Sequence, residues 1–133
     1  MASFPVHRDD ASAAFFDAAA AGRLLVRRCA NGHYLGTSLR LAALPVQCPT
    51  CRSTEIAWVE ASGDARLVSW TVAHARDGSP TGVTGIVELA EGPWMYALLD
   101  VAPDAELAVG QPLAVGFVSS GEGGESIPVF RPA

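Results

Sequence analysis

The chain carries all three of its cysteines between Cys29 and Cys51, and this stretch limits the possible folds more than any other. The segment Cys29-Ala-Asn-Gly-His33 is followed by fourteen residues and then by Cys48-Pro-Thr-Cys51. Two short turns that each present two ligands are typical of a tetrahedral Zn²⁺ site. The spacing therefore predicts a Cys₃His zinc site, with Cys29, His33, Cys48 and Cys51 as its ligands.

The second half of this motif follows the usual knuckle pattern, and the first half departs from it. In Cys48-Pro-Thr-Cys51 the proline fixes one φ angle without removing an N–H that the turn requires. A regular first knuckle would have a cysteine where this chain has Gly32, so the longer imidazole of His33 has to span one extra residue. The alternative is a metal-free site of buried cysteines and a surface histidine. Four protein ligands leave no open position, so a bound zinc ion would be structural.

The size and cysteine content of the chain limit the class of protein to which it can belong. A length of 133 residues suits one domain. Three cysteines, two of them in one knuckle, argue against a disulfide framework and favour a reducing compartment. No apolar run approaches the roughly 18 residues of a membrane span, and the charged N-terminal segment 7–10 does not fit a signal peptide. We therefore expect a cytoplasmic protein that does not enter a membrane.

The charge balance also restricts the possible partners. The formal net charge is −5 and the isoelectric point is near 5.0, which argues against a role based on attraction to a phosphate backbone. Half of the residues are hydrophobic and the mean hydropathy is +0.25. This content suggests that some apolar surface is reserved for a partner protein.

Residues 1–22 are predicted to form an untethered tail of eight residues and one short helix. Asp9 or Ser12 is suited to cap the start of this helix, and its apolar face includes Phe15 and Phe16. The two rings are either core contacts within the chain or part of a partner surface. Because a helix attached to a zinc ribbon has little core to join, Phe15 and Phe16 are candidate partner-binding residues.

The rest of the chain is predicted to be β structure. We expect a zinc ribbon over residues 23–61, with strands before the first knuckle and after the second, and a barrel over residues 62–133. The barrel strands are predicted at residues 66–74, 83–89, 94–101, 113–119 and 126–130. Five strands with no helix between them favour a small closed barrel, and an OB-fold is the usual five-stranded solution.

An ordered set of short motifs across residues 10–132 supports a resemblance to a known family. In chain order these are Gly22-Arg-Leu-Leu25, Pro45-Val-Gln-Cys-Pro-Thr-Cys51, Trp58-Val-Glu-Ala-Ser-Gly63, Val68-Ser-Trp-Thr-Val72, Gly85-Ile-Val-Glu-Leu89, Val109-Gly-Gln-Pro-Leu113 and Pro128-Val-Phe-Arg-Pro132. This order resembles the DUF35 family, which combines a rubredoxin-like zinc ribbon with an acyl-CoA-associated OB-fold. The expected fold is thus mainly β, with an N-terminal helix, the ribbon and a five-stranded OB-fold barrel.

The resemblance also implies a function. Members are small partner subunits of a thiolase, an acyltransferase or a retro-aldol lyase, and they take part in the degradation of steroid side chains, aromatic acids and related acyl-CoAs. The chain is therefore expected to bind such a subunit and to assist acyl-CoA binding or turnover. It departs from the family pattern at Gly32 and His33, where a cysteine and then a glycine are usual, and at Arg52, where another glycine is usual.

The chain is not expected to be an enzyme by itself. Its histidines, His7, His33 and His74, have no nucleophile or orienting carboxylate at a motif spacing, and the sequence lacks the nucleophile-elbow, phosphate-loop and zinc-protease motifs. The cysteines are better explained as metal ligands than as nucleophiles. We therefore interpret the chain as a non-catalytic accessory subunit.

Four residues are candidates for contact with coenzyme A. Trp70, His74 and Arg76 share one face of the first barrel strand by period two, and Trp94 could join them across the sheet. Arginine can hold phosphates and aromatic rings can stack on adenine. The alternative is a core role for Trp70 and a solvated Arg76.

Two other classes of function remain open. A zinc ribbon and an OB-fold also occur in nucleic-acid-binding proteins, which need a basic groove lined with aromatic side chains. The predicted strand 83–89 has neither an aromatic nor a basic residue. The third class is a purely structural subunit that stabilises its partner. Copurified nucleic acid would favour the first of these, and a copurified catalytic subunit would favour an accessory or structural role.

Overall fold

The structure, a computed structural model, describes residues 5–35 and 47–133. It begins with helix α1 (Ala13–Ala20) and a three-stranded antiparallel sheet. This sheet contains β1 (Leu25–Cys29), β2 (Tyr34–Leu35) and β3 (Ile56–Glu60) in the order β2-β1-β3. The sequence also predicts a hairpin or loop from Tyr34 to Leu44, and most of this segment lies outside the described residues.

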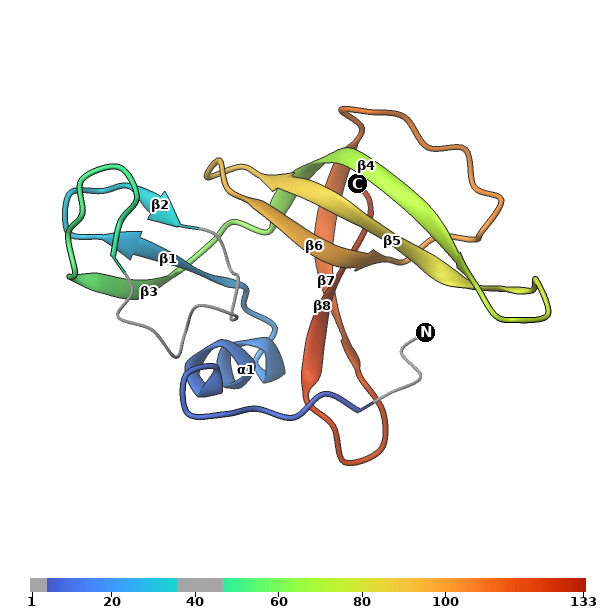
Figure 1. The fold of residues 1–133 in the computed structure, drawn as a ribbon, viewed down its shortest axis with the longest axis horizontal. Coiled ribbons are helices and arrows are strands. Elements are labelled where there is room, and N and C mark those ends of the chain that lie inside the picture. Colours follow the sequence, from blue (N-terminus) through green and yellow to red (C-terminus); the bar gives the residue numbers. More distant parts are fainter. Residues whose placement is uncertain (1–4, 36–46) are drawn as a thin grey trace.

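The remaining five strands form a closed barrel, as expected (Figure 1). They are β4 (Asp64–His74), β5 (Pro80–Leu89), β6 (Trp94–Leu99), β7 (Pro112–Ser119) and β8 (Ser126–Pro132). The order is β4-β5-β6-β8-β7, and β7 pairs back with β4. Neighbouring strands are antiparallel except for β6 and β8. The predicted fold class is confirmed: a mainly β chain with a five-stranded barrel of OB-fold type.

The β4–β5 hairpin is longer than its sequence pattern indicates. Gly78 and Pro80 predict a loop over residues 77–82, but β5 already begins at Pro80, which pairs with His74. The turn is closed by the Ala75 N–H, which donates to the Ser79 carbonyl at 2.8 Å. The hairpin consequently extends beyond the body of the barrel as an arm (Figure 1).

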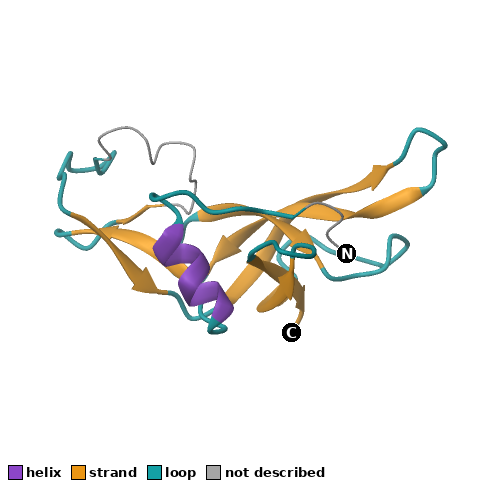
Figure 2. Ribbon diagram, turned by 90° about the horizontal axis from the view of Figure 1, so that it is seen from below, coloured by secondary structure: helices purple, strands orange, loops and turns teal. Residues whose placement is uncertain are grey.

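A reciprocal pair of side-chain hydrogen bonds closes the turn just before helix α1. The Asp9 carboxylate accepts the Ser12 N–H at 2.9 Å, and the Ser12 hydroxyl accepts the Asp9 N–H at the same distance. This is the reciprocal pattern of a capping box, but it lies one turn before the helix: Ser12 is the N-cap residue of α1, and its side chain makes no cap bond to the helix. Figure 2 shows α1 lying against the strands, and no helix among the described residues is long and apolar enough to cross a membrane.

One hydrophobic core joins the helix, the base of the ribbon and the barrel. Its buried members are Phe15, Phe16, Leu24, Val26, Ala61, Ala65, Leu67, Val83, Val87, Leu89, Met95, Leu99, Leu113 and Phe130. A second, much smaller cluster contains Cys29, Leu35 and Cys48, with Cys51 and Ile56 packed against it. The division of the chain at residues 61 and 62 remains a prediction, and the main core extends across it.

The segment before the helix is tied to the barrel, so the expectation of an untethered tail is wrong for the described residues 5–8. The Val6 N–H donates to the Ser120 hydroxyl at 2.8 Å, and the Val6 carbonyl accepts the Glu125 N–H at 2.7 Å. Arg8 forms ion pairs with Glu125 at 2.9 Å and with Asp17 of α1 at 2.5 Å. These contacts fasten the N-terminal segment and the helix to the β7–β8 turn.

Candidate functional site

The four predicted metal ligands come together at the outer end of the small sheet. Cys29 is the last residue of β1, and its Sγ lies 3.4 Å from His33 Nδ1 and 3.8 Å from Cys51 Sγ. The four possible ligand atoms, including Cys48 Sγ, all lie within 4.8 Å of one another. This cluster can hold a metal ion.

The distances fit the geometry of a small tetrahedral ion. Bonds of about 2.3 Å to sulfur and about 2.0 Å to nitrogen place tetrahedral donors roughly 3.5–3.8 Å apart. The separation of 3.8 Å from Cys29 Sγ to Cys51 Sγ falls in this range, and that of 3.4 Å to His33 Nδ1 lies just below it. The extra residue of the first knuckle therefore does not prevent His33 from reaching the site.

Gly32 takes up that extra residue through its backbone conformation. It has φ of 87°, in the left-handed region that favours glycine. Its N–H donates to the Cys29 carbonyl at 3.0 Å, and the Cys29 N–H donates to the His33 carbonyl at 2.9 Å. The turn is thus closed by backbone bonds on both sides of Gly32, and His33 is directed toward Cys29.

Arg52 occupies a glycine-like position in the second knuckle. Its φ is 61°, and it is the one non-glycine residue of the described chain with positive φ. Its N–H donates to the Cys48 carbonyl at 2.7 Å, which holds the turn closed. A residue with a Cβ atom is strained in this region. The family's usual glycine would therefore fit this backbone better than Arg52 does.

The three thiols differ in acidity because their surroundings differ. The Asn31 side-chain amide donates to Cys51 Sγ at 3.2 Å, and this bond, with the Ser53 N–H, lowers the pKa of Cys51 to about 7. Burial opposes ionisation of Cys48, but N–H donors of its own turn outweigh that effect and lower its pKa. Burial raises the pKa of Cys29. The second knuckle therefore supplies thiolates more readily than Cys29 does.

Asn31 was not among the residues predicted to contribute to the site. In the sequence, the Asn-Gly pair indicates only the spacing between Cys29 and His33. The feature that could have identified Asn31 from the sequence is its amide side chain, which lies between two predicted ligands in a turn that has to bend sharply. Only the tertiary structure shows that this amide reaches across to the other knuckle.

The structure does not gather the four candidate coenzyme A residues on one face. Trp70 pairs with Gly85 and Trp94 pairs with Glu88, so the alternation along β5 puts the two rings on opposite faces of the sheet. The Trp94 indole N–H donates to the Glu88 carboxylate at 3.0 Å.

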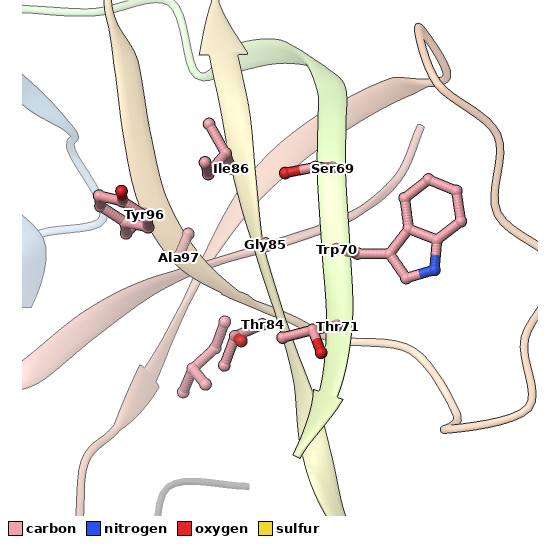
Figure 3. Close-up of a pocket in the computed structure, with 9 residues that line it drawn as sticks. Ser69, Trp70, Thr71, Thr84, Gly85, Ile86, Tyr96 and Ala97 are labelled. Atoms are coloured by element: carbon pink, nitrogen blue, oxygen red, sulfur yellow. The ribbon is translucent and has the colours of Figure 1, made fainter.

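A β-bulge explains this difference from the sequence pattern. Leu67 pairs with Val87 and Ser69 pairs with Ile86, so Val68 is an extra residue that reverses the facing of the strand beyond it. Without this bulge, Trp70 would lie on the same outer face of β4 as Arg66. Figure 3 shows Ser69 and Trp70 pointing to opposite sides of β4.

His74 and Arg76 lie at the far end of the β4–β5 hairpin, away from both tryptophans along the strands. His74 is the last residue of β4, and a second register shift precedes it. Both side chains are exposed on the protruding hairpin. They stay available to a ligand or a partner, but the fold does not join them to Trp94.

The outer face of β4, β5 and β6 is hollowed (Figure 3). The depression has a volume of about 440 Å³ and lies over three consecutive residues of each strand, namely Ser69–Thr71, Thr84–Ile86 and Tyr96–Leu98. None of these residues is charged, and Tyr96 is 84% exposed beside it. This face is the one on which OB-folds carry their ligands.

Phe15 and Phe16, the candidate partner-binding residues, are buried in this chain. They are only 6% and 5% exposed, and the Phe15 ring lies 5.9 Å from that of Trp58. A partner therefore does not reach either ring while α1 keeps this position. Their burial corresponds to the alternative role, that of core contacts within the chain.

Comparisons with known proteins find similarity over the barrel and over nearly the whole chain. A family profile described as the C-terminal OB-fold domain of ChsH2 matches residues 58–118. A "Probable enoyl-CoA hydratase alpha subunit" from Thermomonospora curvata is 33% identical over 132 residues, which are 96% of this chain and 39% of that protein. A "DUF35 domain-containing scaffold protein" from Pyrococcus furiosus is 32% identical over 62% of this chain and 60% of its own length. The chain thus spans less than two thirds of these curated relatives.

Two solved structures are similar over nearly the full chain. The one described as "Ltp2-ChsH2(DUF35) aldolase" has a TM-score of 0.75 and 30% sequence identity, and the match covers 94% of this chain and 96% of that chain. A DUF35-family protein of unknown function from Sulfolobus solfataricus has a TM-score of 0.57 and 16% identity over 94% and 85% of the two chains, which supports the fold alone. The chain belongs to the DUF35 family.

Proposed function

We propose that this chain is a non-catalytic accessory subunit that binds an enzyme of the thiolase superfamily and assists it in binding or converting an acyl-CoA. The observation that carries the proposal is the similarity to the DUF35 chain of the Ltp2-ChsH2(DUF35) aldolase, with 30% identity and a TM-score of 0.75. The relative described as a scaffold protein supports a role in assembly.

The arrangement of the reactive side chains supports a non-catalytic role. In the described part of the chain, the three cysteines lie in one cluster with His33. Together these four residues offer four ligand atoms. A metal ion with four protein ligands has no free position for substrate or water. His7 lies in the N-terminal segment and His74 on the β4–β5 arm, away from this cluster in the fold.

We propose that the metal is zinc and that its role is structural. Sulfur and imidazole donors in a tetrahedral cluster suit Zn²⁺. Among the described residues, the apolar cluster around the site contains only Leu35 and Ile56 besides the proposed ligands. A ligand set bound to zinc stabilises such a segment where apolar packing is too limited to do so.

We propose the hollow on β4, β5 and β6 as the surface that contacts the partner enzyme. An uncharged depression with an exposed aromatic rim resembles the centre of a protein interface, where charged residues are depleted and tyrosine is enriched. Tyr96, Ser69 and Thr84 supply hydroxyl groups for hydrogen bonds across it. Coenzyme A phosphates fit better near Arg76 on the β4–β5 arm, because the hollow contains no cation.

The proposal is tested by producing the chain together with the thiolase-like subunits encoded in its own genome. We expect a stoichiometric complex in size-exclusion chromatography with light scattering, about one zinc per chain, and acyl-CoA binding that is tighter for the complex than for either subunit. A chain that stays monomeric with every such subunit would contradict the accessory role. Copurified nucleic acid in place of a protein would support the nucleic-acid alternative.

A further inference from the structure

The sulfur atoms of the metal centre receive their hydrogen bonds in a regular pattern. Cys29 Sγ accepts the N–H groups of Asn31 and His33, the latter at 3.3 Å. Cys48 Sγ accepts those of Thr50 and Cys51. Each of these two sulfurs therefore has two backbone donors, both from the turn that the cysteine itself begins.

Cys51 cannot complete the same pattern with backbone groups. It accepts the Ser53 N–H, but the preceding amide of Arg52 already donates to the Cys48 carbonyl at 2.7 Å. In the opposing turn, the Ala30 N–H donates to the Glu55 carbonyl at 2.9 Å and the Gly32 N–H to the Cys29 carbonyl at 3.0 Å. These nearby amides are thus already committed to other acceptors.

The side chain of Asn31 provides the second donor to Cys51. Its Nδ2 lies 3.2 Å from Cys51 Sγ, so one residue serves both knuckles: its backbone N–H bonds to Cys29 and its amide group to Cys51. We propose that Asn31 is a positioning residue of the metal centre, which fixes Cys51 in its ligating orientation and neutralises part of the charge on its thiolate. The inference rests on the structural metal ion proposed above.

The exposure of Asn31 supports a role that depends on charge. Asn31 is exposed, and an exposed hydrogen bond to a neutral thiol competes poorly with water. A bond to a thiolate is charge-assisted and about twice as strong as a neutral one. Three thiolates around a divalent ion leave a net negative charge, which N–H donors to sulfur offset.

Two variants of Asn31 and one control test this role in the full chain. Asn31→Leu keeps the shape of the side chain without its N–H donors, and Asn31→Asp replaces them with a negative acceptor. Ser53→Ala is the control, because Ser53 lies beside the same knuckle and its hydroxyl contacts the Glu55 N–H at 3.2 Å rather than a sulfur. Zinc affinity is measured by competition with a chromogenic chelator.

We expect Asn31→Leu to weaken zinc binding on the order of 10-fold, the lower end of the usual effect of losing a partner of a metal ligand. Asn31→Asp should weaken it at least as much, because its carboxylate repels the thiolate. Ser53→Ala should keep the wild-type affinity. The cobalt-substituted protein provides a second measurement: losing the Asn31 donor raises the energy of the sulfur lone pair, so the thiolate-to-cobalt charge-transfer band should move to longer wavelength.

The outcomes separate this inference from the proposed metal centre. An Asn31→Leu protein with wild-type zinc affinity and an unmoved cobalt band would overturn the positioning role while leaving the metal centre intact. Lower affinity with an unmoved band would show general weakening of the turn, and would also contradict the role. A wild-type chain that binds neither zinc nor cobalt would refute the metal centre itself.

Discussion

The ribbon and the barrel of this chain are each stabilised by a different kind of interaction. The barrel has a continuous ladder of strands around a core in which Val87, Val129 and Phe130 are completely buried. In the part of the chain that the structure describes, the outer end of the ribbon has a small cluster made mostly of its own cysteines. The base of the ribbon belongs to the barrel's core through Leu24 and Val26. Stability is therefore expected to depend on apolar packing in one region and on metal ligation in the other.

The largest effect is expected from Cys48→Ser, which removes a proposed metal ligand that is only 1% exposed. Metal binding contributes on the order of 10 kcal/mol to folding in small zinc modules, so the variant should lose its metal and the order of both knuckles. Hydrogen exchange with mass spectrometry should show lost protection at residues 29–35 and 48–56 and retained protection in β4–β8. Equal loss in the barrel would contradict the distinction between the regions.

The reverse experiment is Phe130→Ala, which opens a cavity in the barrel core. A buried phenylalanine cut to alanine costs about 3–5 kcal/mol, and this side chain is 0% exposed. We expect a lower free energy of unfolding in urea, with the metal content at low temperature unchanged. A protein that loses metal as readily as Cys48→Ser would show that the ribbon has no stability of its own.

A third change affects the outer face of the barrel without affecting its stability. Tyr96→Ala removes a ring that is 84% exposed, so the free energy of unfolding should stay nearly constant. If the hollow is the partner surface, affinity for the partner enzyme should fall by about 2 kcal/mol, or roughly 30-fold. Val109→Ala is the matched control, since Val109 is also exposed but lies on the β6–β7 loop. Unchanged affinity for the Tyr96 variant would place the interface elsewhere.

The ribbon contains backbone strain that a single substitution should relieve. Arg52→Gly replaces a residue at φ of 61° with one that adopts this conformation freely, so we expect a gain of about 1 kcal/mol in the stability of the metal-loaded ribbon. Gly32→Ala should do the opposite, because Gly32 has φ of 87°. Resistance of the two variants to chelator-induced unfolding measures both effects. A destabilising Arg52→Gly change would mean that the Arg52 side chain contributes more than its strain costs.

The smallest effect concerns pH and the N-terminal segment. The Arg8 guanidinium bonds to Glu125 and lowers the pKa of that carboxyl group. Because the folded pKa lies below the unfolded one, this contact is fully stabilising above the unfolded pKa and is lost as pH falls through the folded pKa. Exchange of the Glu125 amide, which donates to the Val6 carbonyl, should therefore speed up in acid after correction for its intrinsic pH dependence.

Glu125→Gln should remove this acid dependence, because the amide does not titrate near that pH. Glu122→Gln is the control, since Glu122 is exposed in the same turn. An acid dependence that persists in Glu125→Gln would assign the effect to other carboxyl groups of the N-terminal segment, such as Asp9, whose pKa is lowered by its bonds to Ser12.

The features predicted correctly from the sequence depend on short-range patterns. Alternation of apolar residues located the barrel strands, and turn residues separated them. The spacing around Cys48 and Cys51 identified a possible metal site, and the structure brings His33 to that site despite the extra residue. Each of these signals lies within a few residues, where the geometry of a strand or a tight turn relates sequence position directly to direction.

The sequence by itself thus determined the five-stranded barrel, the small ribbon and the cluster of cysteines and His33 that could hold a metal ion. The tertiary structure alone decided the burial of Phe15 and Phe16, the reversal of Trp70 by the bulge at Val68, and the reach of Asn31 to Cys51. The physical reason is that these three outcomes depend on contacts between segments distant in the chain. A helix face is buried only if another element covers it, and one unpaired residue changes the facing of the whole strand that follows.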